Sequence, residues 1–84
     1  MKRIFADEAW EDYLYWQKQD KRVVERIDKL LRETQREPFA DVGKPEPLNH
    51  ALAGCWSRRI NDEQRMVYSV NDDSQLLAQL RFHC

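Results

Sequence analysis

The stretch CWSRRINDEQRMVYSVNDDSQLLAQLRF, residues 55–82, decides the fold. It contains three runs rich in aromatic, β-branched and other apolar residues, and Asn/Asp-rich segments separate them. Residues 55–60, 65–70 and 75–82 are therefore expected to be strands, because Asn and Asp favour the tight turns between strands. We expect these three strands to form an antiparallel meander.

Alternation along these strands assigns their side chains to two faces. An apolar row is expected to face the core: Met66, Tyr68 and Val70, then Leu76, Ala78, Leu80 and Phe82. The opposite face collects polar and basic side chains: Arg65, Arg81 and His83, with Arg59 from the first strand. Arg58 is in phase with Trp56 and Ile60 instead. The sequence thus predicts a basic face opposite the core.

The N-terminal half changes to helical spacing. Residues 7–16 are expected to form a helix capped by Asp7, with Trp10, Tyr13 and Leu14 at helical intervals. A second helix, capped by Asp20 and ended by Pro38, carries one apolar stripe: Val23, Ile27, Leu30 and Leu31. Residues 3–5 are expected to be a short first strand. The expected fold is α+β, a single domain over residues 1–84 with an N-terminal helical hairpin packed on a small, mainly antiparallel sheet.

Composition limits the class of protein. Of the 84 residues, 42% are hydrophobic and 35% charged, which is typical of a soluble globular protein. No apolar run reaches the roughly 20 residues that span a bilayer, and the N-terminus lacks the apolar core of a signal peptide. The two cysteines, Cys55 and Cys84, lack CxxC spacing and suggest free thiols in a reducing compartment. We therefore expect a cytoplasmic protein without a membrane partner.

The distribution of charge is more informative than its sum. The net charge is −1, which argues against strong binding to nucleic acid by charge alone. Four of the five acids after residue 42 lie in the turns 61–63 and 71–73, so the strands carry Arg without a neighbouring acid. This pattern fits an anion-binding face, but it also fits a solvated surface or contacts with a partner protein.

The segment GKPEPL, residues 43–48, holds a carboxylate between two prolines. Each proline pushes the residue before it toward extended geometry and lacks an N–H donor, so this segment is expected at a sheet edge or in a loop. Glu46 is then either part of an edge that resists aggregation or a positioned carboxylate.

Glu46, Arg65 and His83 together suggest a reaction class. Cleavage of RNA by its own 2′-hydroxyl needs a base for the hydroxyl proton, a cation for the charge on the phosphorane and an acid for the departing 5′-oxygen. A carboxylate, a guanidinium and an imidazole can fill these roles without a metal or cofactor. Any small domain contains these residue types, so structural or partner-binding roles remain open.

Other chemistry-bearing residues receive simpler interpretations. His50 is expected to make a loop hydrogen bond. A zinc site from His50, Cys55, His83 and Cys84 is not expected, because the adjacent His83 and Cys84 would point to opposite faces of a strand. The same geometry argues against a Cys84–His83 nucleophile. Five aromatic residues are expected mainly in the core, with some contact to a second copy or a partner protein: Trp10, Tyr13, Trp16, Trp56 and Tyr68.

Motifs along the whole chain resemble the YoeB-type toxins of the RelE/ParE toxin–antitoxin superfamily. They are YLYWQ (13–17), DKR (20–22), PF (38–39), GKPEPL (43–48), WSRRI (56–60), R-VY (65, 67–68) and RFH (81–83). The resemblance implies the compact toxin fold of that superfamily and a ribosome-dependent endonuclease that cuts mRNA in the A site. It also implies inhibition by a cognate YefM-like antitoxin, with a homodimer as a further possibility.

The resemblance also implies roles for residues. Glu46 would be the general base, Arg65 the phosphate-binding cation and His83 the general acid. Further positions would line the mRNA path: Lys44, Arg59, Arg81 and the terminal Cys84. Two positions depart from the family pattern, which commonly ends in His-Tyr and has Lys after PEPL, where this chain has Cys84 and Asn49. Both departures bear on catalytic efficiency more than on reaction type.

Two alternatives remain at this point. A ParE-like protein of the same fold would act by binding DNA gyrase without cleaving RNA, and it would not need Glu46, Arg65 and His83. The other alternative is a relic toxin, in which Cys84 and Asn49 mark weakened activity.

Overall fold

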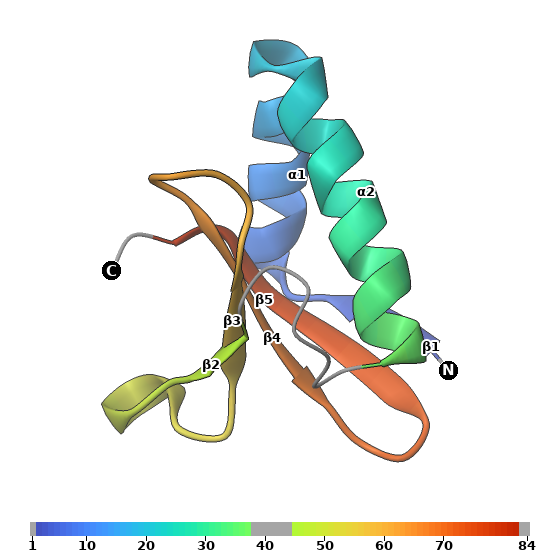
Figure 1. Cartoon of the computed structure of the whole chain (residues 1–84), viewed down its shortest axis with the longest axis vertical. Coiled ribbons are helices and arrows are strands. Elements are labelled where there is room, and N and C mark those ends of the chain that lie inside the picture. The colour runs from blue at the N-terminus through green and yellow to red at the C-terminus, as the bar shows by residue number, and fades with distance from the viewer. Residues whose placement is uncertain (1, 38–44, 83–84) are drawn as a thin grey trace.

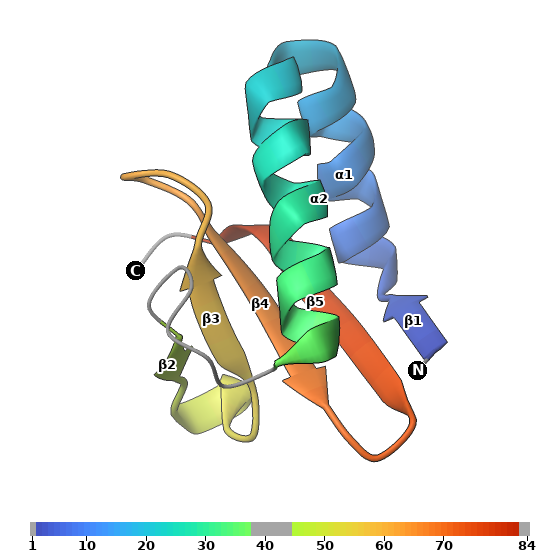
Figure 2. The same ribbon diagram turned by 45° about the vertical axis from the view of Figure 1, so that its right-hand side comes forward.

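The computed structural model describes residues 2–37 and 45–82. The elements follow in the order β1 (Lys2–Phe5), α1 (Asp7–Gln19), α2 (Lys21–Arg36), β2 (Glu46–Pro47), a 3₁₀ turn (His50–Leu52), β3 (Trp56–Arg59), β4 (Arg65–Val70) and β5 (Ser74–Phe82). The helices lie side by side against one face of the sheet (Figures 1 and 2). This arrangement confirms the expected α+β fold. In the part of the chain that the structure describes, no helix is long and apolar enough to cross a membrane.

The sheet has five strands in the order β1-β5-β4-β3-β2. Strands β3, β4 and β5 form the predicted antiparallel meander, and β2 adds to β3 in the antiparallel sense. Strand β1 pairs with β5 in parallel, with Lys2 opposite Ser74 and Phe5 opposite Leu77. The prolines of the GKPEPL segment therefore lie at the outer edge, where a missing N–H donor costs no ladder hydrogen bond.

The helix boundaries show which local signals decide. Asp20 caps α2 as predicted, and its side chain accepts a hydrogen bond from the backbone N–H of Arg22 at 2.9 Å. The predicted start of α1 was wrong by one residue, because Ala6 is the N-cap and Asp7 is already helical, and the helix runs on to Gln19 instead of ending at residue 16. The Ala6 N–H donates to the Leu77 carbonyl, so the end of the β1–β5 ladder sets the start of α1.

The core lies between the helices and the sheet. The predicted stripe of α2 is buried there together with residues from α1, the strands and the turn after β3: Ala9, Val23, Ile27, Leu30, Leu31, Ile60, Met66, Tyr68, Leu77 and Leu80. Tyr13, Trp16 and Trp56 pack against this cluster from partly buried positions, as expected for the aromatic set. Trp10 is the exception, because 47% of it is exposed.

Two irregularities in the pairing of β4 with β5 change the predicted faces. Tyr68 pairs with Leu77, Val67 with Gln79 and Arg65 with Phe82, so β5 carries extra residues relative to β4. Each extra residue reverses the phase of alternation, as β-bulges do. Leu77 therefore replaces Leu76 in the core, and 37% of Leu76 is exposed. The prediction that Phe82 faces the core was also wrong, because its partner Arg65 lies on the opposite face.

Candidate active site

Arg65, the first residue of β4, is the centre of the candidate site. Its guanidinium Nε donates to the Ser57 hydroxyl oxygen at 2.7 Å, and Nη2 contacts the Ser57 carbonyl oxygen at 3.4 Å. Only 8% of Arg65 is exposed and Ser57 is fully buried, so the guanidinium is held in a nearly buried position against β3. Ser57 pairs with Val67, so it shares the sheet face of Arg65, opposite the helices. We call this the site face: Glu46, Ser57, Arg59, Arg65 and Val67.

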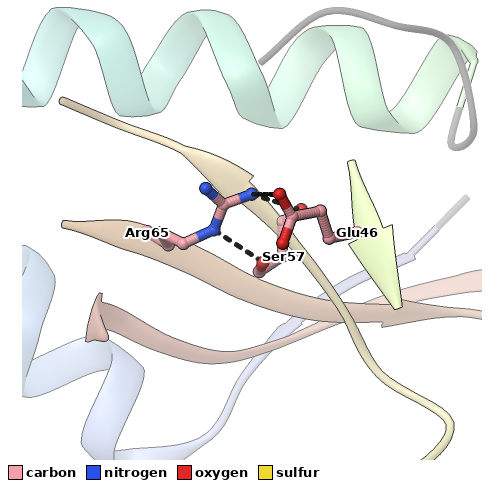
Figure 3. Close-up of polar contacts among 3 residues, drawn as sticks. All are labelled: Glu46, Ser57 and Arg65. Carbon is pink, nitrogen blue, oxygen red and sulfur yellow. Dashed lines mark hydrogen bonds and ion pairs between the residues drawn. The ribbon is translucent and has the colours of Figure 1, made fainter. Parts of the chain in front are cut away.

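Glu46 meets this guanidinium from the edge strand. It pairs with Ser57 across β2 and β3, and its Oε1 lies 3.8 Å from Arg65 Nη2. Figure 3 shows the Arg65 guanidinium between Ser57 and Glu46. The Glu46 side chain is 59% exposed, whereas that of Arg65 is 9% exposed. A cation held by the fold thus stands beside a carboxylate that solvent or a ligand can reach.

This geometry suits a reaction at phosphate. Guanidinium groups bind phosphate oxygens through the same planar fork that pairs with carboxylates. A carboxylate at the edge of the same site can accept a proton from a hydroxyl that approaches the phosphorus. Of the proposed catalytic residues, Glu46 and Arg65 lie together, whereas His83 lies outside the described residues.

A second cation shares the site face. Arg59 pairs with Arg65 across β3 and β4, and its side chain is exposed. Lys44 and Cys84, which were predicted to line an RNA path with it, lie outside the described residues. Cross-strand partners share a face, so two arginines lie side by side at the end of the β3–β4 hairpin.

Arg81 departs from the prediction. Its guanidinium lies over the ring of Tyr15 in α1, with Cζ 3.6 Å from the ring centroid. The expectation that it joins Arg65 on the site face was therefore wrong, and the bulges in β5 are the reason. The strict alternation assumed from the sequence cannot reveal such a change of phase.

His50 and Cys55 lie in the loop region between β2 and β3. His50 begins the 3₁₀ turn with a positive φ of 59°, and its carbonyl accepts from the Ala53 N–H at 3.0 Å. Cys55 is a half-buried free thiol. Among residues 2–37 and 45–82, no three His, Cys, Asp or Glu side chains gather in a way that could hold a metal ion.

Ser57 is the site residue that sequence reasoning missed. A serine inside a strand carries no catalytic signature of its own, and its importance depends on the register that places it beside Arg65. The only available signal was its phase with Arg59.

Comparisons with known proteins identify the family. A family model of YoeB-like toxins of bacterial type II toxin–antitoxin systems matches residues 5–84. Toxin YoeB of Escherichia coli (strain K12) is 57% identical over 83 residues, which cover 99% of each chain. A YoeB/ParE toxin from Agrobacterium tumefaciens has 46% identity and a TM-score of 0.94, with 100% of both chains covered.

Staphylococcus aureus YoeB provides two further solved structures, and both cover 100% of this chain and 98% of theirs. Its dimer has a TM-score of 0.93 and its heterotetrameric complex with YefM has 0.89, each at 40% identity. These full-length matches agree with the motifs and with the observed fold. The chain belongs to the YoeB-like toxins of bacterial type II toxin–antitoxin systems.

Proposed function

We propose that this toxin is a ribosome-dependent endoribonuclease that cuts mRNA in the A site and thereby inhibits translation. The observation that carries the proposal is the Arg65 guanidinium, held by Ser57 on one side and placed beside the exposed carboxylate of Glu46 on the other. A toxin that acts only by binding gyrase does not need this pair.

In the proposed reaction, the Glu46 carboxylate takes the proton of the ribose 2′-hydroxyl as its oxygen attacks the adjacent phosphorus. Arg65 stabilises the charge that develops on the phosphorane oxygens. His83, protonated, donates its proton to the 5′-oxygen as the P–O bond breaks, so the products are a 2′,3′-cyclic phosphate and a 5′-hydroxyl. Neither a metal nor a cofactor takes part in these steps.

The end of β5 supports the role of His83. Phe82, the last described residue, pairs with Arg65, and His83 follows it in the chain. Arg59 is proposed to bind the mRNA backbone beside the reacting phosphate, together with Lys44. The terminal Cys84 is proposed to lie against a base. Arg81 is left out of this set because it stacks on Tyr15.

The partners follow from relatives. Because Staphylococcus aureus YoeB was solved in complex with YefM, we propose a YefM-like antitoxin for this cytoplasmic toxin, with homodimerisation as in the solved dimer.

Dependence on the ribosome follows from charge. A chain with net charge −1 lacks the broad basic surface that would hold free RNA, so the ribosome must present the mRNA.

The test is to map RNA ends after the purified toxin is added to translating ribosomes and, separately, to free mRNA. We expect cleavage only on ribosomes, with 5′-hydroxyl ends and 2′,3′-cyclic phosphate or 3′-phosphate ends. Products with 5′-phosphates would overturn the mechanism, and equal cleavage of free RNA would overturn ribosome dependence. Intact mRNA together with lost gyrase supercoiling would favour the ParE-like alternative.

A further inference from the structure

We propose that one face of helix α1 positions the end of β5, and through it the C-terminal tail (residues 83–84), for the reaction. Three residues on that face, Asp12, Tyr15 and Trp16, hold Leu80 and Arg81 near the end of β5. We call these three residues the α1 clamp. The proposal rests on the proposed function, because the clamp acts on the chemistry through His83.

The clamp begins where the pairing of β1 with β5 ends. Strand β1 pairs with β5 only as far as Phe5 opposite Leu77, and Ala6 adds one hydrogen bond to the Leu77 carbonyl. Strand β5 continues to Phe82, while the chain on its β1 side turns into α1 at Asp7. Beyond Leu77, the backbone of β5 therefore needs other hydrogen-bond partners on this side.

Side chains of α1 supply these partners at Leu80. The Leu80 N–H donates to Asp12 Oδ2 at 2.9 Å, and the Leu80 carbonyl accepts from Trp16 Nε1 at 2.8 Å. Asp12 and Trp16 are four residues apart, so they lie one above the other on the same helix face. Together they imitate the donor and acceptor of a neighbouring strand.

Burial shows that the contacts at Leu80 are part of the fold's interior. Leu80 is fully buried and only 9% of Asp12 is exposed. A carboxylate is costly to bury unless its oxygens are hydrogen-bonded, and here a backbone N–H of β5 provides such a bond. Tyr15, on the same face, lies under the Arg81 guanidinium and makes an edge contact with Trp16 at 5.0 Å between ring centroids.

The clamp holds β5 in place after the two register shifts in its pairing with β4. These register shifts lie at Val67/Tyr68 and Arg65/Val67 of β4, and they determine which β5 residue meets Arg65. A slip of one residue after a bulge would exchange the faces of all later side chains. By holding Leu80 and Arg81 toward α1, the clamp keeps Phe82, the residue that precedes His83, opposite Arg65.

The test compares variants of α1 that each lose one hydrogen bond. Trp16→Phe removes the bond to the Leu80 carbonyl, and Asp12→Leu removes the acceptor of the Leu80 N–H. Tyr13→Phe is the matched control, because it removes a 2.9 Å bond from the same helix to Asp28 of α2 without touching β5. In single-turnover cleavage at saturating ribosomes, we expect losses on the order of 10–100-fold for the first two variants and less than about 2-fold for Tyr13→Phe.

Two further readouts separate positioning from simple stability. Asp12→Asn keeps an acceptor oxygen and should restore most of the rate that Asp12→Leu loses. In a His83→Gln background, Trp16→Phe should cause little further loss, because both changes act through one group. Multiplicative losses in the double variant, or equal rates for Trp16→Phe and Tyr13→Phe, would overturn the proposal.

Hydrogen exchange tests the clamp independently of RNA cleavage. The amides of a C-terminal peptide that spans residues 78–84 should exchange faster in Trp16→Phe than in the wild type or Tyr13→Phe. Unchanged exchange in Trp16→Phe would contradict the clamp even if cleavage fell. If the wild type cut no mRNA on ribosomes, the proposed function would fail, and with it the catalytic purpose of the clamp. The exchange result would still decide whether α1 holds the tail.

Discussion

Arg58 and Arg65 are two buried arginines in neighbouring strands whose side chains lie on opposite faces of the sheet. Arg58 is fully buried on the helix side, where Nε donates to the Tyr68 hydroxyl at 3.1 Å and Nη2 to the Glu37 carbonyl at 2.8 Å. Arg65 lies on the site face, where its described partners are Ser57 and the exposed carboxylate of Glu46.

The partners distinguish a structural arginine from a candidate catalytic one. Glu37 is the C-cap of α2, so Arg58 places a cation at the negative end of the helix dipole and satisfies a terminal carbonyl. Burial raises the pKa of Tyr68, and the hydrogen bond from Arg58 partly opposes this effect. Arg58 thus binds groups inside the fold, whereas Arg65 lies beside the Glu46 carboxylate, which solvent reaches.

The change with the largest expected effect removes the proposed general acid without altering the core. His83→Gln should lower single-turnover cleavage on ribosomes by about 10²–10⁴-fold, the usual contribution of a general acid. Unfolding by urea should be nearly unchanged, because His83 follows the last core residue of β5, Leu80. A chain that ends at Phe82 should behave similarly. Near-normal cleavage by either variant would exclude His83 as the acid.

Arg65→Ala should have the next largest effect. We expect the chemical step to slow by about 10²–10³-fold, because Arg65 meets a charge that grows in the transition state. The measurement is single-turnover cleavage at saturating ribosomes. Arg59→Ala is the control on the same face, and it should weaken ribosome binding more than the chemical step, as expected for a backbone phosphate contact. An unchanged rate for Arg65→Ala would remove this residue from the site.

Arg58→Met should show the opposite pattern. It leaves the Glu37 carbonyl and the Tyr68 hydroxyl without a hydrogen bond from Arg58, and we expect a loss of about 2 kcal/mol in the free energy of unfolding. In a domain of this size, such a loss lowers the melting temperature by roughly 8–16 °C. Cleavage per folded molecule should stay unchanged. Lost cleavage with unaltered unfolding would reverse the roles assigned to the two arginines.

The sequence predicted most of the fold because its signals are local and strong. The stripe of α2, the Asp20 cap and the Asn/Asp turns all depend on neighbouring residues, and the structure confirms them. The faces of β5 could not be predicted in the same way. They depend on bulges formed against β4, which moved Leu77 into the core, Phe82 to the site face and Arg81 onto Tyr15.

In the candidate site too, the residues with a local sequence signal were predicted, and those that depend on long-range contacts were missed. Glu46 stood out because two prolines enclose it, and Arg65 because of its phase in an apolar strand. Asp12 and Trp16 gave no such signal, because their contacts with Leu80 join residues more than sixty positions apart. Ser57 was missed for the same reason, since only strand pairing places it beside Arg65.

Ser57→Ala should have the smallest effect and tests how Arg65 is held. The change removes the hydroxyl that accepts from Arg65 Nε at 2.7 Å, but it keeps the Ser57 carbonyl and the neighbouring carboxylate. Loss of one hydrogen bond to a charged group, about 1.5 kcal/mol, should slow single-turnover cleavage roughly 10-fold. Ser69→Ala, in β4, is the control and should have no effect. In an Arg65→Ala background, Ser57→Ala should cost nothing more, because Ser57 acts through the guanidinium. A full 10-fold loss in that background would show that Ser57 acts independently of Arg65.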